Sequence, residues 1–198
     1  MEKVTACLIT WKRQQNLPKI IASLTECSFI DEIIIRDNSK SDNIINYARY
    51  ESAMKAKNEI IYVQDDDYII HNIEDIYNTF IKDPHRIANG GIDEYLRVVP
   101  DNIYGETQMA IVGWGSMFKN HWFQKPLLQY TNVYGKDYCF YRETDRIFSM
   151  LFNRHCNMVK VDAEPLFGDR NEDALSSQEE HVKFKNMAIK RCGGILGI

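Results

Sequence analysis

The chain has 198 residues, of which 44% are hydrophobic and 26% are charged, and its formal net charge is −4. This composition is that of an ordinary globular protein, and the length suits one domain with a sizeable core. Tight, non-specific binding to a nucleic-acid backbone needs a clustered excess of Lys and Arg, so we expect no nucleic-acid partner.

No apolar run approaches the roughly 18 residues of a membrane span, and the N-terminus lacks a hydrophobic segment followed by a cleavage site. We therefore expect a cytoplasmic protein with no membrane span. The five cysteines are Cys7, Cys27, Cys139, Cys156 and Cys192. Because they are scattered and show no CxxC spacing, we expect reduced, mostly buried thiols and neither a disulfide framework nor a structural zinc site.

The first third of the chain alternates between strand and helix patterns. The expected elements are a strand at 4–10, a helix beginning at Asn16 and Pro18, a strand at 31–37, a helix carrying Ile44, Ile45 and Ala48, and a strand at 59–64. The strands are continuously apolar, which predicts a mainly parallel sheet covered by helices on both faces. Ligands of such sheets bind beyond the carboxyl ends of the strands. The polar clusters TWKR, RDNS and QDDD all follow strands and are therefore expected to meet at one edge.

The rest of the chain adds weaker patterns. We expect a helix at 72–83, strands at 86–91 and 109–118, helices at 121–130 and 142–152, and a strand at 157–162. The segment from 168 to 198 gives no clear pattern.

Three adjacent carboxylates, Asp65, Asp66 and Asp67, follow the third expected strand. They repel one another, so a positive group is expected beside them. In an extended backbone Asp65 and Asp67 would share one side and Asp66 the other. Two carboxylates on one side suit Mg²⁺ or Mn²⁺, whose remaining positions are filled by water and phosphate oxygens. An acidic loop exposed to water is the simpler alternative, but the triplet's position at the end of a buried strand favours a metal site.

Several strings together resemble glycosyltransferases with the glycosyltransferase A fold. They are TWKRQQNLPKIIASL, EIIIRDNSKSDN, YVQDDDYII, the glycine-bearing GWGSMF, ETDRIFSMLF and ALSSQEEH. The chain is most similar in character to exostosin-type and other small metal-dependent transferases, including compact ones encoded by large DNA viruses. The resemblance implies a single Rossmann-like domain spanning 1–198, with a mixed, mainly parallel sheet flanked by helices. Its nucleotide-binding half would be about 1–70, and 71–198 would hold the sugar and the acceptor.

The resemblance also implies roles for individual residues. Asp67 would be the direct metal ligand, with Asp65 and His181 as further ligands. The residues implied in nucleotide-sugar binding are Thr10, Arg13, Asp37, Asn38, Asp65, Asp66, Gly113, Trp114, Gly115 and Lys183, with Lys185 as an alternative to Lys183. Asp145 or Glu143 would be catalytic; Thr144 separates them, whereas the family's pair is adjacent, so which one acts stays open. Trp114 suits either packing or a sugar platform. Arg36 and Arg49 could contact a phosphate, but salt bridges are the simpler expectation for both.

These observations predict an Mn²⁺- or Mg²⁺-dependent glycosyltransferase of the hexosyltransferase type. It would move a sugar from a UDP-sugar to a hydroxyl of a glycan or glycoconjugate, with retention of configuration. One alternative is a sugar nucleotidyltransferase, although WKRQQNLP lacks the glycines of a triphosphate-binding loop. Another is a non-catalytic module that binds a nucleotide-sugar.

Overall fold

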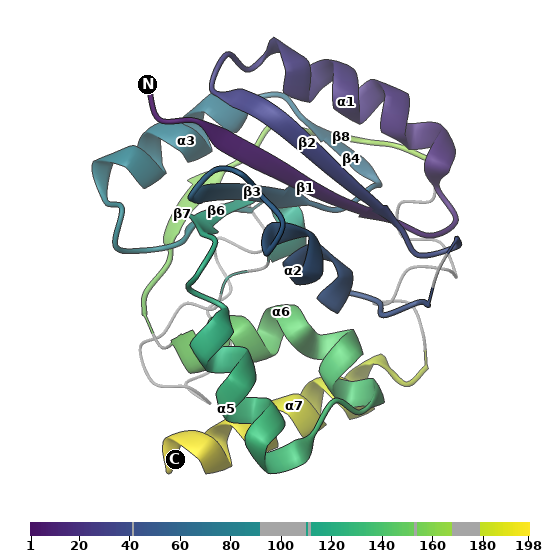
Figure 1. Ribbon diagram of the computed structural model, residues 1–198, viewed down its shortest axis with the longest axis vertical. Coiled ribbons are helices and arrows are strands. Elements are labelled where there is room, and N and C mark those ends of the chain that lie inside the picture. The colour runs from purple at the N-terminus through teal and green to yellow at the C-terminus, as the bar shows by residue number, and fades with distance from the viewer. Residues whose placement is uncertain (41, 92–109, 111, 153, 168–178) are drawn as a thin grey trace.

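The computed structural model describes residues 1–40, 42–91, 110, 112–152, 154–167 and 179–198. A six-stranded sheet in the order β2-β1-β3-β6-β5-β7 forms the centre, and β4 pairs with β8 in a separate two-stranded sheet (Figure 1). The strands are β1 (Val4–Thr10), β2 (Ile30–Asp37), β3 (Ile60–Gln64), β4 (Tyr68–Ile70), β5 (Ala88–Gly91), β6 (Ser116–Lys119), β7 (Asn157–Lys160) and β8 (Ala163–Pro165).

Helices cover both faces of the large sheet. The α-helices are α1 (Leu17–Glu26), α2 (Tyr47–Ala53), α3 (Ile73–Lys82), α5 (Gln124–Tyr134), α6 (Tyr138–Phe152) and α7 (His181–Leu196), with 3-10 turns η1 (Gln14–Asn16) and η2 (Val112–Trp114). Figure 1 shows α1 and α3 on one side of the sheet and α2, α5, α6 and α7 on the other.

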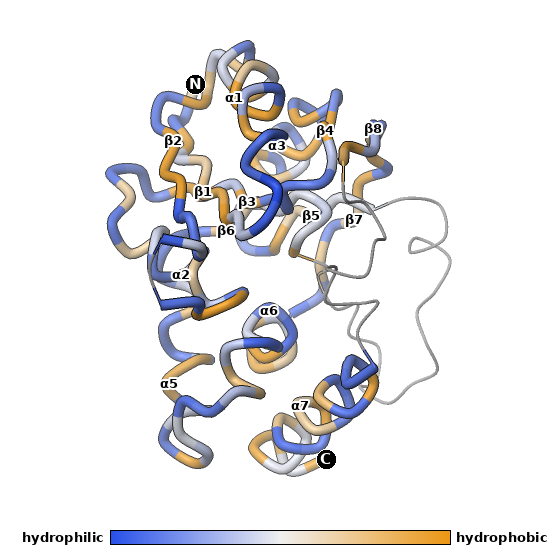
Figure 2. The backbone as a smooth tube through the Cα atoms, turned by 90° about the vertical axis from the view of Figure 1, so that its right-hand side faces the viewer, coloured by the Kyte–Doolittle hydropathy of each residue, from blue (hydrophilic) through white to orange (hydrophobic). Residues whose placement is uncertain are grey.

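Two hydrophobic cores result from the alternation of side chains along the strands. Val4, Ala6 and Leu8 of β1 belong to the core beneath α1 and α3. Cys7, between them in sequence, belongs to the core formed with α2, α5, α6 and α7. Figure 2 shows β1 coloured mainly as hydrophobic, as expected of a strand whose side chains enter both cores.

The mixed character of the sheet is confirmed. β1 runs parallel to β2 and β3, and β5 runs parallel to β7. β6 is antiparallel to both of its neighbours, β3 and β5. The strand direction reverses at β6, which follows η2. β1, β2 and β3, whose ends carry the three polar clusters, therefore form a parallel part of the sheet.

Two expectations about local structure were wrong, and one helix was not predicted. The strand expected at 109–118 is reduced to β6, because Gly115 has a φ of 86° that no extended strand allows, while 109 and 111 lie outside the described residues. The helix expected to carry Ile44 and Ile45 begins only at Tyr47, because Ile45 has a φ of 48°. The unpredicted segment near the C-terminus contains α7, the longest helix in the described part of the chain.

All five cysteines are free, and they are mostly buried as expected: Cys7, Cys139, Cys156 and Cys192 are buried and Cys27 is half-buried. Within the described ranges, no helix is long and apolar enough to cross a membrane.

Gly115 provides a test of this fold. A Cβ there would lie 2.8 Å from Cδ1 of Ile70, and the φ of 86° is strained for any L side chain. We expect Gly115→Ala to lower the free energy of unfolding by about 2–4 kcal/mol, from backbone strain and overpacking together. Gly197→Ala is the control, because Gly197 has a φ of 77° with nothing within 4 Å of the added Cβ. Urea unfolding of both variants measures the difference, and equal losses would contradict the packing argument.

Candidate active site

The acidic triplet lies at the point where the chain changes direction across the sheet. From β1 the chain passes to β2 on one side and then to β3 on the other. In open α/β sheets this switch point is where ligands bind, outside the carboxyl ends of the strands. Thr10 ends β1, Asp37 ends β2, and Asp65 follows directly after β3. The three polar clusters therefore do meet at one edge.

Asp66 and Asp67 are held by Arg13. One guanidinium nitrogen of Arg13, Nη1, lies 3.0 Å from Oδ1 of Asp66 and 2.8 Å from Oδ2 of Asp67. Asp66 is only 8% exposed and Asp67 only 9%, so the triplet is not an acidic loop open to water. Burial opposes the charge of Arg13, but the two carboxylates outweigh it and raise the pKa of Arg13. Burial also raises the pKa of Asp66, although Arg13 opposes that shift.

The backbone of this acidic turn is fixed from a distant part of the chain. Nδ2 of Asn16 donates to the carbonyl oxygen of Asp66 and to that of Phe167, both at 2.8 Å. The backbone N–H of Leu166 donates to the carbonyl of Asp67 at 2.7 Å. The turn is therefore joined both to the start of α1 and to the segment after β8.

Asp65 points to a different partner. Its Oδ1 lies 2.6 Å from Nη2 of Arg49, and its backbone N–H donates to the carbonyl of Gly113 at 2.8 Å. A Cβ on Gly113 would lie 2.1 Å from Oδ2 of Asp65, so only glycine allows η2 to approach this closely. The Asp65 side chain remains 45% exposed, which leaves one side of its carboxylate open to a ligand.

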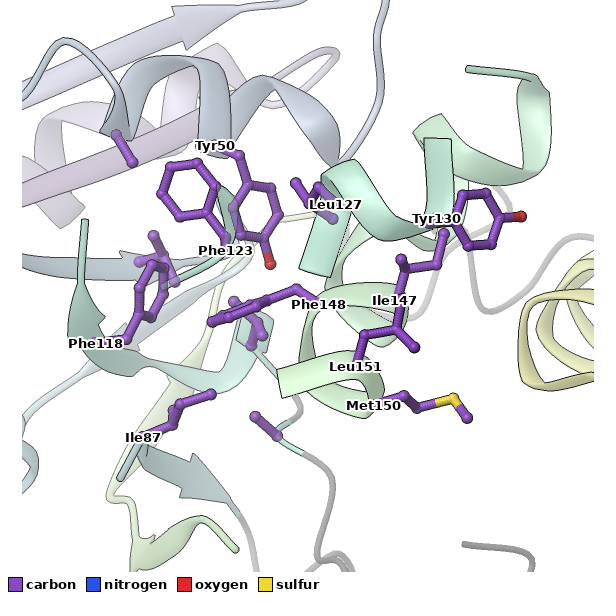
Figure 3. Packing of buried hydrophobic residues seen from close by; sticks show 14 of the residues in the cluster. Tyr50, Ile87, Phe118, Phe123, Leu127, Tyr130, Ile147, Phe148, Met150 and Leu151 are labelled. Atoms are coloured by element: carbon purple, nitrogen blue, oxygen red, sulfur yellow. The ribbon is translucent and has the colours of Figure 1, made fainter. Parts of the chain in front are cut away.

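Asp145 joins the same charge network from α6. Its Oδ1 accepts a hydrogen bond of 2.8 Å from the Tyr50 hydroxyl, and its Oδ2 lies 3.5 Å from Nη1 of Arg49. Figure 3 shows the Tyr50 ring packed among Phe118, Phe123 and Phe148, which fixes the position of its hydroxyl. Burial raises the pKa of Asp145 to about 6, although Arg49 opposes the shift.

Glu143 lies at a break in α6. Its φ of −106° and ψ of 21° are not helical, so α6 consists of two helical pieces that meet there. Glu143 faces Nε of Arg146 at 3.1 Å and Nε of Arg142 at 3.7 Å. His181 is the first residue of α7. Burial lowers the pKa of His181, although the nearby Glu143 opposes this shift.

Asp37 and Asn38 shape the neighbouring strand end. The hydroxyl and the backbone N–H of Ser39 donate to Oδ1 of Asp37, and these bonds, with one from Gln14, lower the pKa of Asp37 to about 2. The backbone N–H of Asn38 donates to the carbonyl of Thr10 at 2.8 Å. The strand ends that bear Thr10 and Asp37 are thus joined side by side, with Asp37 ionised at neutral pH.

The triplet fits a divalent ion only as a half-site. Its oxygen ligands suit Mg²⁺ and Mn²⁺, which commonly take one or two protein carboxylates and complete their shells with water and phosphate oxygens. In the part of the chain that the structure describes, no group of three His, Cys, Asp or Glu side chains could hold a metal ion. An ion at the triplet would therefore need oxygens from a bound ligand, and it would share Asp67 with Arg13.

Comparison with known proteins addresses the fold. No protein-family model matches the chain, and no curated protein matches it. Solved structures do match. Residues 1–349 of S. aureus TarS in complex with UDP-GlcNAc align with a TM-score of 0.52 and 11% identity, covering 96% of this chain and 66% of that one.

A second match is glucosyl-3-phosphoglycerate synthase from Mycobacterium tuberculosis in complex with Mg²⁺ and UDP. Its TM-score is 0.52 at 11% identity, covering 97% of this chain and 80% of that one. A longer S. aureus TarS structure gives a TM-score of 0.50 at 11% identity, covering 98% of this chain and 42% of that one.

The fold is the glycosyltransferase A fold. The match extends over nearly all of this chain, which spans about two thirds of TarS 1–349. At 11% identity the likeness concerns the architecture, and the ligands of these neighbours are their own. The expected nucleotide-diphospho-sugar transferase fold is thereby confirmed, while the resemblance to exostosin-type and viral transferases stays a prediction.

Within the glycosyltransferase A fold, one expectation about the acidic triplet was wrong. Asp65 and Asp67 do not share a partner; instead Asp66 and Asp67 share Arg13, because β3 ends at Gln64 and the next residues turn. The assignment of Asp65, Asp67 and His181 as metal ligands stays a prediction. The cation expected beside the triplet is supplied by arginine side chains.

The other candidate residues have neighbours of their own. Trp114 packs against the ring of Tyr68, with centroids 4.4 Å apart, which agrees with the packing alternative. Lys183 is 63% exposed on α7 and lies 3.5 Å from Glu180. Lys185 lies one turn into α7, close enough to His181 to lower its pKa. The roles of these residues and of Gly115 toward a ligand stay predictions.

The expected salt bridges of Arg36 and Arg49 are confirmed, but the position of Arg49 at the centre of the site was not anticipated. Arg36 pairs with Glu51 at 3.0 Å, away from the triplet. Tyr50 and Asn16 were also missed. The signal for Arg49 is structural: its side chain is buried with Ala48, Tyr50 and Ala53 in α2, and its sequence neighbours do not show this.

Removal of Arg13 should make stability depend strongly on pH. In Arg13→Gln, two nearly buried carboxylates lose their cation, so their pKa values in the folded state rise above those in the unfolded chain. The folded chain then binds more protons than the unfolded chain between these pKa values, and stability falls as the pH rises through them. We expect the variant to be roughly 3 kcal/mol less stable than wild type at pH 7, with a smaller gap near pH 4.

Urea unfolding between pH 4 and pH 7 measures this gap. The control is Lys40→Gln, which removes an exposed cation 3.3 Å from Asp37 and should change stability by less than about 1 kcal/mol. A gap for Arg13→Gln that does not change with pH would contradict the ion pairing.

Proposed function

We propose that this protein is a glycosyltransferase of the hexosyltransferase type that transfers a sugar from a UDP-sugar to a hydroxyl of a glycan or glycoconjugate. Residues 1–70 would form the nucleotide-binding half of a single domain, and 71–198 would hold the sugar and the acceptor. The proposal rests mainly on one observation: within a glycosyltransferase A fold, the acidic triplet sits at the sheet's switch point and is linked through Arg49 to Asp145. UDP and UDP-GlcNAc bound to neighbours of the same fold give it further support.

The donor would bind along the carboxyl ends of β1, β2 and β3. We assign Thr10, Asp37 and Asn38 to the uracil and ribose, because they line adjacent strand ends and Asp37 is ionised. Arg13 and Asp66 would contact the nucleotide from the triplet, and the exposed side of Asp65 would face the ribose or the sugar. Gly113, Trp114 and Gly115 would approach the sugar, since Gly113 lets this backbone pass close to Asp65.

A divalent cation is part of this proposal, with Asp67 as its direct ligand. Asp65, two residues before Asp67, would contact the ion through water. Phosphate oxygens of the donor would supply the ligands that the chain lacks. Bound Mg²⁺ or Mn²⁺ would neutralise the negative charge that builds on the departing diphosphate. His181 and Lys183 or Lys185 at the start of α7 are assigned to the same diphosphate.

Asp145 is the better candidate than Glu143 for the group that faces the reacting sugar carbon or the acceptor. Glu143 is 6% exposed and lies between two arginines, whereas Asp145 shares Arg49 with the donor-side Asp65. Glycosyl transfer passes through a cationic, oxocarbenium-like state. An ionised Asp145 can stabilise that carbon, as a retaining enzyme needs, or accept the acceptor's proton, as an inverting one needs. We propose retention.

The metal proposal is tested by UDP release from UDP-sugars. We expect release to require Mn²⁺ or Mg²⁺, and UDP-sugars to raise the melting temperature only when the ion is present. Asp67→Asn should abolish both effects, because an amide is a far weaker ligand than a carboxylate. Asp31→Asn, which removes a carboxylate paired with Lys57 away from the site, is the control.

Metal-independent release, or an unchanged Asp67→Asn variant, would overturn the metal assignment. A module that only binds nucleotide-sugars would be stabilised by them without releasing UDP. Formation of a UDP-sugar from UTP and a sugar phosphate would indicate the nucleotidyltransferase alternative.

The raised pKa of Asp145 predicts the pH dependence of transfer. Asp145 must be ionised in either catalytic role, and its pKa is about 6. We therefore expect kcat/KM to be constant above about pH 7 and to fall roughly tenfold per pH unit well below pH 6. Asp145→Asn should remove most of the activity and this dependence together. A profile that stays flat down to pH 5 would exclude Asp145 as the group that titrates.

A further inference from the structure

Arg49 contacts both sides of the proposed site. It comes from α2, Asp65 follows β3, and Asp145 belongs to α6. Two different nitrogens of the guanidinium are used: Nη2 lies 2.6 Å from Asp65 and Nη1 lies 3.5 Å from Asp145. A single rigid, planar group therefore lies between the two carboxylates.

Stability alone does not account for this arginine. The Arg49 side chain is 2% exposed, and removing a charge from water to that extent costs several kcal/mol even when the charge is paired. Apolar side chains in place of Arg49, Asp65 and Asp145 together would avoid that cost, and Tyr50 and Ala53 beside Arg49 already belong to a hydrophobic core. A buried ion pair is commonly no more stabilising than well-packed apolar residues of similar volume.

The elements that carry Arg49 and Asp145 are fixed relative to one another. At the start of α2, the backbone N–H of Asn46 donates to the carbonyl of Tyr141 at 3.1 Å, and its Nδ2 donates to the carbonyl of Arg142 at 2.8 Å. Tyr50, one residue after Arg49, holds the other oxygen of Asp145. On the β3 side, the backbone N–H of Asp65 donates to the carbonyl of Gly113 at 2.8 Å, which fixes the backbone from which the Asp65 side chain reaches Arg49. Arg49 is thus common to the contacts that hold both carboxylates.

We propose that Arg49 is a positioning residue that fixes the donor-side carboxylate Asp65 and the catalytic carboxylate Asp145 at one separation. The inference rests on the proposed function, because it assigns Asp65 to the donor and Asp145 to the reacting centre. Its consequence is that one substitution at Arg49 affects donor binding and turnover together. Substitutions that disturb only one carboxylate affect mainly one of these quantities.

Arg49→Lys is the informative variant. Lysine keeps the positive charge, but its single ammonium group cannot present two nitrogens in a fixed plane, so it can hold one carboxylate and not both. We expect the variant to fold, to bind a UDP-sugar about tenfold more weakly, and to show kcat lowered on the order of 100-fold, as displacements near 1 Å can cause. Affinity is measured by calorimetry with Mn²⁺ present, kcat by UDP release, and folding by urea unfolding.

Two variants serve as comparisons. Tyr50→Phe removes the other anchor of Asp145 and leaves Asp65 untouched, so we expect lowered kcat with donor affinity within twofold of wild type. Arg36→Lys alters the ion pair between Arg36 of β2 and Glu51 of α2, the helix that also carries Arg49. It leaves the ion pairs of Asp65 and Asp145 unchanged. It should match wild type in both measurements.

The outcomes separate this inference from the proposed function. If wild type transfers sugar and Arg49→Lys has the same donor affinity and kcat, charge alone suffices and the inference is wrong, while the function stands. If wild type neither binds UDP-sugars nor releases UDP, the proposed function is wrong and the inference falls with it. A variant that loses turnover but binds the donor normally would also contradict a shared anchor.

A double-mutant cycle gives an answer even if Arg49→Lys does not fold. Asp65→Asn and Asp145→Asn are measured singly and together for kcat/KM. Because both side chains are held by one guanidinium, we expect their effects to deviate from multiplicative behaviour by at least about threefold. Effects that multiply within twofold would overturn the inference.

Discussion

Two arginines make it possible for three adjacent carboxylates to lie at the end of a buried strand. Arg13 pairs with Asp66 and Asp67, and Arg49 pairs with Asp65. Without these cations, repulsion and the cost of leaving water would favour either protonated carboxyls or an exposed loop. The chain itself therefore supplies part of the positive charge that the triplet requires, but two arginines leave the three carboxylates with an excess of negative charge. A divalent ion that entered with its donor would offset that excess.

The rest of the architecture can be understood from this constraint. Arg13 can reach the triplet because β1 lies beside β3 in the sheet and the turn after β1 comes to the same edge. Arg49 can do so because α2 packs in the core beneath β1 and β3, next to Tyr50 and Phe118. The same helix brings Arg49 and Tyr50 to Asp145 at the break in α6. The two hydrophobic cores therefore determine which charges meet.

The sequence was sufficient where a feature depends on local pattern. The apolar runs of β1 and β3 and the polar residues after them define the sheet edge and the location of the triplet.

The sequence was not sufficient where the packing of the elements determines which residues are partners. The direction of Asp65 depends on the turn after Gln64 and on Gly113, and the significance of Arg49 depends on how α2 meets α6. Asp65 and Asp145, the two partners of Arg49, lie 16 and 96 residues after it in the sequence. No local sequence pattern predicts contacts between residues so far apart. α7 escaped prediction because its polar and apolar residues form only a weak stripe.

The bridge made by Asn16 has a consequence for biosynthesis. Its Nδ2 joins Asp66 to Phe167, which stands 151 residues after Asn16. Contacts between such distant parts of a chain form late, because loop closure must precede them. During translation the first parallel strands could pair soon after leaving the ribosome, but the acidic turn would acquire its final backbone only once the region around Phe167 had emerged. A nascent chain interrupted before that point would carry the charged residues of the site without its shape.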